Sequence, residues 1–236
     1  MIESYSAAGR RHRQKKQEGQ DALAFREKGT EAVIVLADGV SSCLFGGEGA
    51  GCCADAAADL LLQKGRNLLG CGGRETAEFI TSHIVYEQQR AAKEQGRPAE
   101  EYASTLAAVY YDRRDGKLLY CSLGDSLILA VRRGQCEILA LPPDSARGCC
   151  VTMTVHAERG MQTGILDARG VEAVYIFSDG AWEVLFEGGS LKADARTMLI
   201  NRWYADLREY LQTQNCEDDA SFISIDLKST ARRNAA

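Results

Sequence analysis

Aspartates that follow apolar runs are the residues of this chain most suited to chemistry. The stretch "VIVLADGVSS" (33–42) ends on Asp38-Gly39, and "VYIFSDGAWE" (174–183) repeats the arrangement with Asp179-Gly180. Asp21 follows a Gly-Gln pair, Asp125 lies in "LGDS", and Asp218-Asp219 precede the last apolar segment. One such Asp is usually a turn former, because its side chain bonds the nearby backbone. Five placements in one chain indicate something more.

Carboxylates that share one side of a sheet repel each other unless a cation lies between them. Oxygen ligands suit Mg²⁺ or Mn²⁺ better than zinc. The glycine after each Asp lets backbone approach closely, and its carbonyl can serve as a further ligand. The sequence therefore predicts a site for divalent cations.

The elements that must position these residues can be read from periodicity and turn signals. We expect strands over 22–26, 32–37, four segments within 104–141, 151–156, 171–177 and 221–227, and helices over 46–63, 74–96 and 192–213. The last helix would bury one face that includes Met198, Leu199 and Trp203, and Trp182 also looks like a core residue. His83, on the second helix, looks structural. Because helices do not follow every strand, the pattern favours an α+β fold with antiparallel sheets and helices outside.

Composition narrows the class of protein. The chain has 236 residues, of which 45% are hydrophobic and 26% charged, and no linker-like segment divides it. We therefore predict one globular domain over 1–236, with a disordered tail of the last eight or so residues. A net charge of −5 argues against a general nucleic-acid binder. No long apolar window and no signal-like N-terminus occur, so we expect a cytoplasmic protein without a membrane partner.

Other chemistries fit the sequence poorly. Nine cysteines include no Cys-x-x-Cys pair, which disfavours zinc and favours reduced thiols in the core. "GDSL" (124–127) spells a serine-hydrolase signature, but no histidine follows it in a late Asp-x-x-His motif. "GGEGAGCC" lacks the Lys-Ser/Thr of a phosphate-binding P-loop. The basic run Arg10–Lys16 is either a solvated face or a phosphate-attracting segment.

Five motifs, in order through nearly the whole chain, carry a family resemblance. They are "GRRHRQKKQEGQDAL", "VLADGVSS" with "GGEGA", "STLAAVYY" with "LYCSLGDSLILAVRRG", "IFSDGAWEVL" and "EDDASFISI". In this arrangement the chain resembles the metal-dependent protein phosphatases of type 2C (the PPM family), and particularly their compact bacterial branch. The resemblance implies a four-layer α-β-β-α sandwich, in which two mostly antiparallel β-sheets are flanked by helices.

The resemblance also implies roles for individual residues. Asp38 would bridge two Mn²⁺ or Mg²⁺ ions, with the Gly39 carbonyl on the second, while Asp179 and Asp218 would complete the shell of the first. Asp21 would hold waters bound to the ions. Asp125, together with Asp179, matches the position of a third and weaker metal. Two ions about 3.5–4 Å apart activate a water molecule that attacks phosphorus in line, and no phosphoenzyme is needed.

The chain departs from the family pattern at several positions. Many eukaryotic members place a His, proposed as general acid, where this chain has Val40. Leaving-group protonation must then come from water. The phosphate-binding Arg expected five residues before Asp21 is Lys16, which offers a point charge without the bidentate fork. Arg13 and His12 could assist in phosphate binding. Asp219 would add negative charge beside the ligands.

The sequence therefore predicts a Mg²⁺/Mn²⁺-dependent hydrolase that removes phosphate from phosphoserine or phosphothreonine in proteins. Its partners would be a phosphorylated protein substrate and a cognate Ser/Thr kinase, as in signalling. One alternative is a catalytically silent domain of the same fold that serves as a binding or regulatory module. Another is a metal-dependent phosphoesterase that acts on a small phosphate ester.

Overall fold

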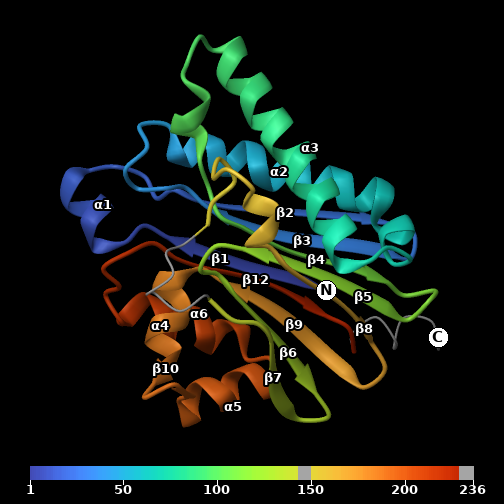
Figure 1. Cartoon of the computed structure of the whole chain (residues 1–236). Helices are drawn as coiled ribbons and strands as arrows, with labels where there is room; N and C mark the ends of the chain where they lie inside the picture. Colours follow the sequence, from blue (N-terminus) through green and yellow to red (C-terminus); the bar gives the residue numbers. More distant parts are fainter. Residues whose placement is uncertain (143–149, 229–236) are drawn as a thin grey trace.

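The structure, a computed structural model, describes residues 1–142 and 150–228. The predicted disordered tail lies outside the described residues. Over the described part, two five-stranded antiparallel sheets pack face to face, with helices on both outer sides (Figure 1). This is the predicted α+β, four-layer α-β-β-α sandwich. Within the same ranges, no helix is long and apolar enough to cross a membrane.

One sheet has the strand order β2-β3-β4-β5-β8, and helices α2 and α3 cover its outer face. These elements are β2 (Asp21–Lys28), β3 (Glu31–Asp38), β4 (Leu106–Asp112), β5 (Lys117–Leu123), β8 (Gln162–Asp167), α2 (Gly46–Leu68) and α3 (Gly73–Glu94).

The other sheet has the order β1-β12-β9-β6-β7, and α5 and α6 pack on its outer face. Its elements are β1 (Ile2–Ala7), β12 (Ala220–Asp226), β9 (Val171–Phe177), β6 (Leu127–Arg132), β7 (Gln135–Ala140), α5 (Ala193–Asn201) and α6 (Tyr204–Thr213). The smaller elements include helix α1 (Arg10–Lys15), helix α4 (Asp179–Leu185), the hairpin of β10 (Phe186–Glu187) with β11 (Ser190–Leu191), and the 3-10 helices η1 (Ala99–Tyr102) and η3 (Ala157–Arg159).

The apolar run before Asp38 forms β3, which pairs with β2 on one side and β4 on the other. Val33 and Val35 belong to the core under α2 and α3, whereas Ile34 and Leu36 belong to the core between the sheets. Both faces of the strand are therefore buried, which explains why its sequence does not alternate. Each such side chain contributes about 1.5–3 kcal/mol of burial free energy, so the position of Asp38 is firmly set.

Small residues let α2 lie close to its neighbours. A Cβ at Gly49 would lie 2.1 Å from the carbonyl oxygen of Tyr102, and one at Gly65 would lie 2.5 Å from the ring of Tyr110. Gln88 of α3 reaches into the same contact and donates hydrogen bonds to the carbonyl oxygens of Gly49 and Tyr102. The helix layer is thereby fixed to the segment that leads into β4.

Several sequence predictions for this fold are wrong. Residues 151–156 form turns, not a strand, and Val155 is 83% exposed. The helix predicted over 192–213 is two helices, because Arg202 between them takes a left-handed conformation with φ 58°. Because of this break, Trp203 does not lie in the core, and it is 50% exposed. The four strands predicted within 104–141, in contrast, are confirmed as β4 to β7.

Candidate metal centre

Five aspartates meet at one end of the sandwich because the strands that carry them are antiparallel. Asp38 ends β3 and Asp21 begins β2, and the two residues stand directly opposite each other in the register. Asp179 follows β9, and Asp218 lies just before β12, which pairs with β9. Asp125 lies in the turn between β5 and β6. The strand ends named in the sequence analysis thus converge, as the cation hypothesis required.

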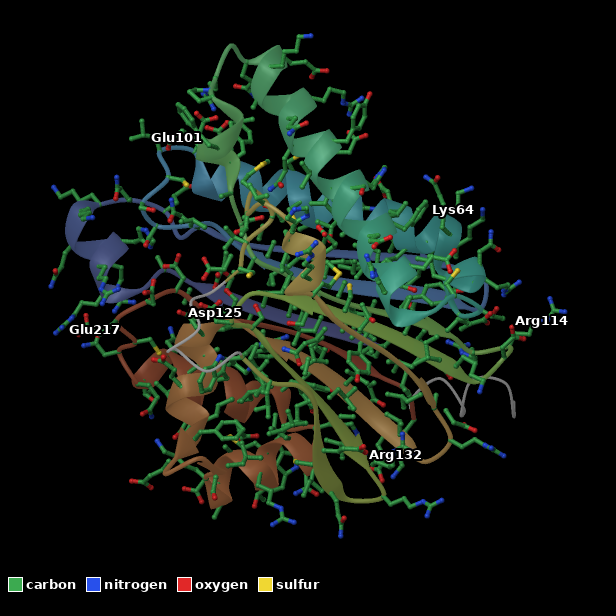
Figure 2. All side chains as sticks on the ribbon, in the orientation of Figure 1. Lys64, Glu101, Arg114, Asp125, Arg132 and Glu217 are labelled. Atoms are coloured by element: carbon green, nitrogen blue, oxygen red, sulfur yellow. The ribbon has the colours of Figure 1, made fainter. Side chains whose placement is uncertain are left out.

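Figure 2 shows Asp125 at the same end of the molecule as α1 and Glu217. Arg114 and Arg132 point away at the opposite ends of their strands (Figure 2). Asp125 and these two arginines therefore lie at opposite ends of the molecule.

A cavity of 290 Å³ opens at this end. Its lining residues are His12, Gln20, Asp38, Gly39, Val40, Ser41, Thr105, Asp125, Val151, Asp179 and Asp218. Four of the predicted carboxylates thus face one space. Asp21 is not in the lining, although it lies opposite Asp38 in the strand register.

Burial and mutual repulsion perturb these acids. Burial, reinforced by the charges of Asp21 and Asp179, raises the pKa of Asp38 well above its usual value. Burial followed by the charge of Asp125 raises the pKa of Asp179 to about 7. The cause of both shifts is the same: a carboxylate that loses water and lies near other carboxylates is easier to protonate.

Asp21 is the most isolated of the group. Neither of its carboxylate oxygens has a hydrogen-bond partner among the described residues, although both are buried. Burial, followed by the charges of Asp219 and Asp179, raises the pKa of Asp21 to about 7, and the nearby hydroxyls of Ser221 and Ser178 only partly oppose this shift. Buried carboxylate oxygens without partners are costly, so this position suits ordered water or a cation.

Local backbone contacts hold Asp38 in place. Its N–H donates to the Thr105 hydroxyl at 2.8 Å, and the Thr105 N–H donates to the Asp38 carbonyl oxygen at 2.8 Å. Gly39 is required next, because a Cβ there would lie 2.3 Å from the backbone of Gly46. The same holds at the second Asp-Gly, where a Cβ at Gly180 would lie 2.4 Å from the carbonyl oxygen of Asp219. In each Asp-Gly pair, the aspartate is therefore followed by a glycine against which another backbone segment packs closely.

Of the three residues predicted to bind phosphate, the structure places only His12 in the lining of the cavity. His12 lines the cavity, with its Nδ1 2.8 Å from Asp219. Arg13 donates instead to the Ala8 carbonyl oxygen and to Asn215, and it lines a separate hollow. Lys16 is exposed at the C-terminal end of α1.

Two contacts at the cavity were missed by the sequence analysis. Arg11 donates to the Asp218 carboxylate at 3.0 Å, which brings a guanidinium to the rim. Trp182, half-buried against the core, also donates its indole N–H to the carbonyl oxygen of Asp125 at 2.8 Å. Arg11 and Asp218 are 207 positions apart, so no local pattern indicates their pairing.

The donor set fits a hard divalent cation, because it consists of carboxylate and carbonyl oxygens in a partly buried space. Among the described residues, however, the acidic, His and Cys side chains do not yet gather into a closed group of three or more ligands. Two of these acids make contacts within the chain: Asp179 accepts from the N–H of Gly180 at 2.6 Å, and Asp218 is paired with Arg11. Coordination of a cation by these two side chains would replace or rearrange those contacts.

A hollow on the helical layer provides a comparison within the molecule. It has a volume of 360 Å³ along α2 and α3, and its lining includes Asp55, Asp59 and Glu87. Arg26 pairs with the two aspartates, and Arg90 pairs with Glu87. Acidic side chains there are neutralised within the chain, whereas those at the candidate centre mostly face one another.

Fold and site together define a two-sheet sandwich with an acidic cavity at the strand ends. A model of the family described as protein phosphatase 2C matches residues 8–220. The chain belongs to this family.

Solved structures support the fold. A bacterial serine phosphatase shares 15% identity at a TM-score of 0.66, and the match covers 96% of this chain and 97% of that one. RsbX in complex with magnesium shares 15% identity at a TM-score of 0.58, with 94% and 92% covered. The serine/threonine phosphatase Stp1 from Staphylococcus aureus shares 13% identity at a TM-score of 0.58, with 96% and 94% covered. No curated protein sequence matches the chain.

Proposed function

We propose that this protein is a Mg²⁺- or Mn²⁺-dependent phosphatase that acts on phosphoserine or phosphothreonine in proteins. The observation that carries the proposal is the cavity lined by Asp38, Asp125, Asp179 and Asp218, where burial and the charges of neighbouring acids raise the pKa of Asp38 and of Asp179. Membership of the protein phosphatase 2C family supports it. So does the fold shared with a bacterial serine phosphatase and with a magnesium complex of RsbX.

The proposal assigns ligands as the family resemblance does. Asp38, the carbonyl oxygen of Gly39, Asp179 and Asp218 would hold two ions, and Asp125 with Asp179 would hold a third, weaker one. Bound ions would supply an activated water for attack on phosphorus and would offset the charge that develops there. Asp21, which lies opposite Asp38 in the strand register, would accept hydrogen bonds from ordered water.

The chain's own hydrogen-bond donors would orient the phosphate. His12 lines the cavity, and the Arg11 guanidinium lies at its rim. A guanidinium offers paired N–H donors that match phosphate oxygens, so Arg11 suits this role once its contact with Asp218 is replaced. Arg13 and Lys16, on the same short helix, would add positive charge that attracts a phosphorylated substrate.

Val40 lines the cavity where some relatives carry an acid. An apolar side chain cannot give a proton, so the leaving hydroxyl group of the substrate must take its proton from water. The partners proposed are a phosphorylated protein and a cognate Ser/Thr kinase, in one domain that works in the cytoplasm.

The test is metal-dependent hydrolysis of p-nitrophenyl phosphate and of a phosphothreonine peptide. We expect turnover only with Mn²⁺ or Mg²⁺, and at least about a 1000-fold loss in Asp38→Ala and in Asp179→Ala, since each removes a proposed ligand. Asp55→Ala is the matched control, because Asp55 is an exposed acid paired with Arg26 on the helical layer. Full activity in Asp38→Ala would disprove the assignment.

The alternatives have separate outcomes. A catalytically silent module would bind no Mn²⁺ at millimolar concentration and hydrolyse neither substrate. A phosphoesterase for small molecules would hydrolyse small esters with Mn²⁺ but leave phosphopeptides intact.

A further inference from the structure

Asp219, next to the proposed ligand Asp218, is buried and makes an unusual set of contacts. Its Oδ1 accepts from the Gly9 N–H at 2.7 Å and lies 2.8 Å from the His12 Nδ1. Its Oδ2 accepts from the Gln20 N–H at 2.6 Å. Residues 9–20, which we call the N-terminal arm, connect β1 to β2. One carboxylate therefore binds the first residue, the last residue and one middle residue of this arm.

The fit around this carboxylate is close. A Cβ at Gly19 would lie 3.0 Å from Asp219 Oδ2, and a Cβ at Gly9 would lie 2.3 Å from the Asp218 backbone. Two further backbone bonds join the arm to the same loop, from Arg10 N–H to the Cys216 carbonyl and from Arg11 N–H to the Glu217 carbonyl. The arm and the loop before β12 thus form one packed unit.

Three consecutive residues of the arm face three consecutive acids. Arg10 pairs with Glu217, Arg11 with Asp218, and His12 with Asp219. The first two pairs are solvent-exposed and screened, so they contribute little. The third is different, because the Asp219 side chain is only 3% exposed and accepts from backbone N–H groups in a dry setting. Of the three side-chain pairs, the one with Asp219 therefore contributes most to holding the arm.

The arm carries one wall of the candidate centre. His12 and Gln20 line the cavity, and Asp21 follows Gln20 directly at the start of β2. Asp219 itself is not in the lining. Its hydrogen bonds therefore reach the cavity through the arm, and its backbone reaches it through its neighbour Asp218.

We propose that Asp219 is a positioning residue, which holds the N-terminal arm against the 216–219 loop and so sets the relative positions of His12, Asp21 and Asp218. Through that geometry it determines the affinity for divalent cations. This inference rests on the proposed metal-dependent function for its second part only, because the attachment of the arm is a property of the chain itself.

Hydrogen exchange of the metal-free protein tests the attachment directly. In Asp219→Ala, the amides of Gly9 and Gln20 should exchange at least about 10-fold faster, while the amide of Val35 in the core keeps its rate. In Asp219→Asn, the remaining oxygen can still accept from Gly9 and His12, so Gln20 alone should be released. Glu217→Gln is the matched control, since it alters an exposed acid of the same loop, and it should leave the amides of both arm ends unchanged.

Calorimetric titration with Mn²⁺ tests the consequence. Asp219→Asn and Asp219→Ala should weaken Mn²⁺ binding by about 10-fold or more, and Glu217→Gln should stay within about twofold of the unmodified protein. Unchanged exchange at Gly9 and Gln20 in Asp219→Ala would overturn the attachment, and released amides with unchanged Mn²⁺ affinity would overturn the link to the centre. If the unmodified protein binds Mn²⁺ but hydrolyses no phosphate ester, the proposed function fails while both readouts still decide the role of Asp219.

Discussion

The two ends of strand β9 place carboxylates in opposite electrostatic settings. Near its start, Glu172 is held by Lys228 at 2.6 Å and by Arg202 at 2.9 Å, and these contacts lower its pKa. Just beyond its end, Asp179 lies near Asp125 and Asp218, and its pKa rises to about 7. Glu172, at the start of the strand, is thus paired with cations of the chain, whereas Asp179, just beyond its end, lies among other acids.

The difference indicates which end stabilises the fold and which performs the function. Glu172 with its cations is complete without any ligand. The acids beside Asp179 raise the free energy of the folded protein until something positive enters. Natural chains keep such costs chiefly at functional sites. Burial alone does not distinguish the two ends, because Asp112 is fully buried far from the cavity and pairs there with Arg66.

The largest expected effect comes from removing one charge at the acidic end. Asp38→Asn should abolish cation binding and cost at least about 1000-fold in kcat. In the absence of metal, the same variant should be more stable than the unmodified protein by about 1–2 kcal/mol, because a repelling buried charge is gone. Urea unfolding without Mn²⁺ measures the expected gain in stability, and unfolding with Mn²⁺ measures the expected loss of stabilisation by the cation. A loss of stability without metal would contradict the comparison.

Breaking the neutralised end should act on stability alone. Arg202→Met leaves Glu172 and Asp226 without the guanidinium that pairs with both, and we expect a loss of about 3 kcal/mol. Metal-dependent activity should be unaffected at temperatures where the variant is folded. Thermal unfolding beside the Mn²⁺ dependence of the rate provides the measurement, and a changed Mn²⁺ requirement would refute the separation of the two ends.

The two ends should also respond to pH with opposite signs. Because the pKa of Asp179 rises from 3.8 to about 7 on folding, the metal-free folded state holds a proton that the unfolded state has lost. Its contribution to stability is fully present below pH 3.8 and is lost as the pH rises through about 7. The lowered pKa of Glu172 has the reverse effect, since its contribution is present above 4.5 and is lost as the pH falls.

Chemical denaturation between pH 3 and 8 separates these contributions. Asp179→Asn should make metal-free stability depend less on pH above 4, whereas Glu172→Gln should flatten the acid side. If stability depended on pH in the same way in the two variants, the two carboxylates would not lie in opposite electrostatic environments.

The smallest effect is expected on the helical layer. Asp55→Asn removes an exposed acid whose partner Arg26 keeps Asp59, so stability should change by less than about 0.5 kcal/mol. Metal binding should not change. A larger loss measured by thermal unfolding would mean that exposed pairs matter more in this chain than the account allows.

Much of this arrangement could be predicted because its signals are local. The apolar runs before Asp38 and Asp179 indicate buried strands, and a strand of fixed position presents its terminal residue at a fixed place. The strands within 104–141 were also predicted from their turns. The wrong predictions concern segments whose structure depends on contacts with residues far away in the sequence. The Thr-rich 151–156 segment looks like a strand, but the real strand β8 packs its Gly164 under the Tyr120 ring, which no local pattern shows.

The site was predictable to the same extent. Carboxylates at strand ends could be found from sequence, whereas the contacts that hold them could not. Asp219 looked like surplus charge beside Asp218, yet its three partners lie about two hundred positions away. Arg11 was overlooked in favour of Arg13, because the orientation of a six-residue helix depends on the loop against which it packs.

Calorimetric titration of the metal-free protein with Mn²⁺, beside Asp38→Asn, tests the central claim most directly. We expect the unmodified protein to bind at least two ions and to release protons from the acids whose pKa is raised. We expect Asp38→Asn to lose this binding. Absence of binding at millimolar Mn²⁺ in a folded protein, or equal binding in Asp38→Asn, would contradict it.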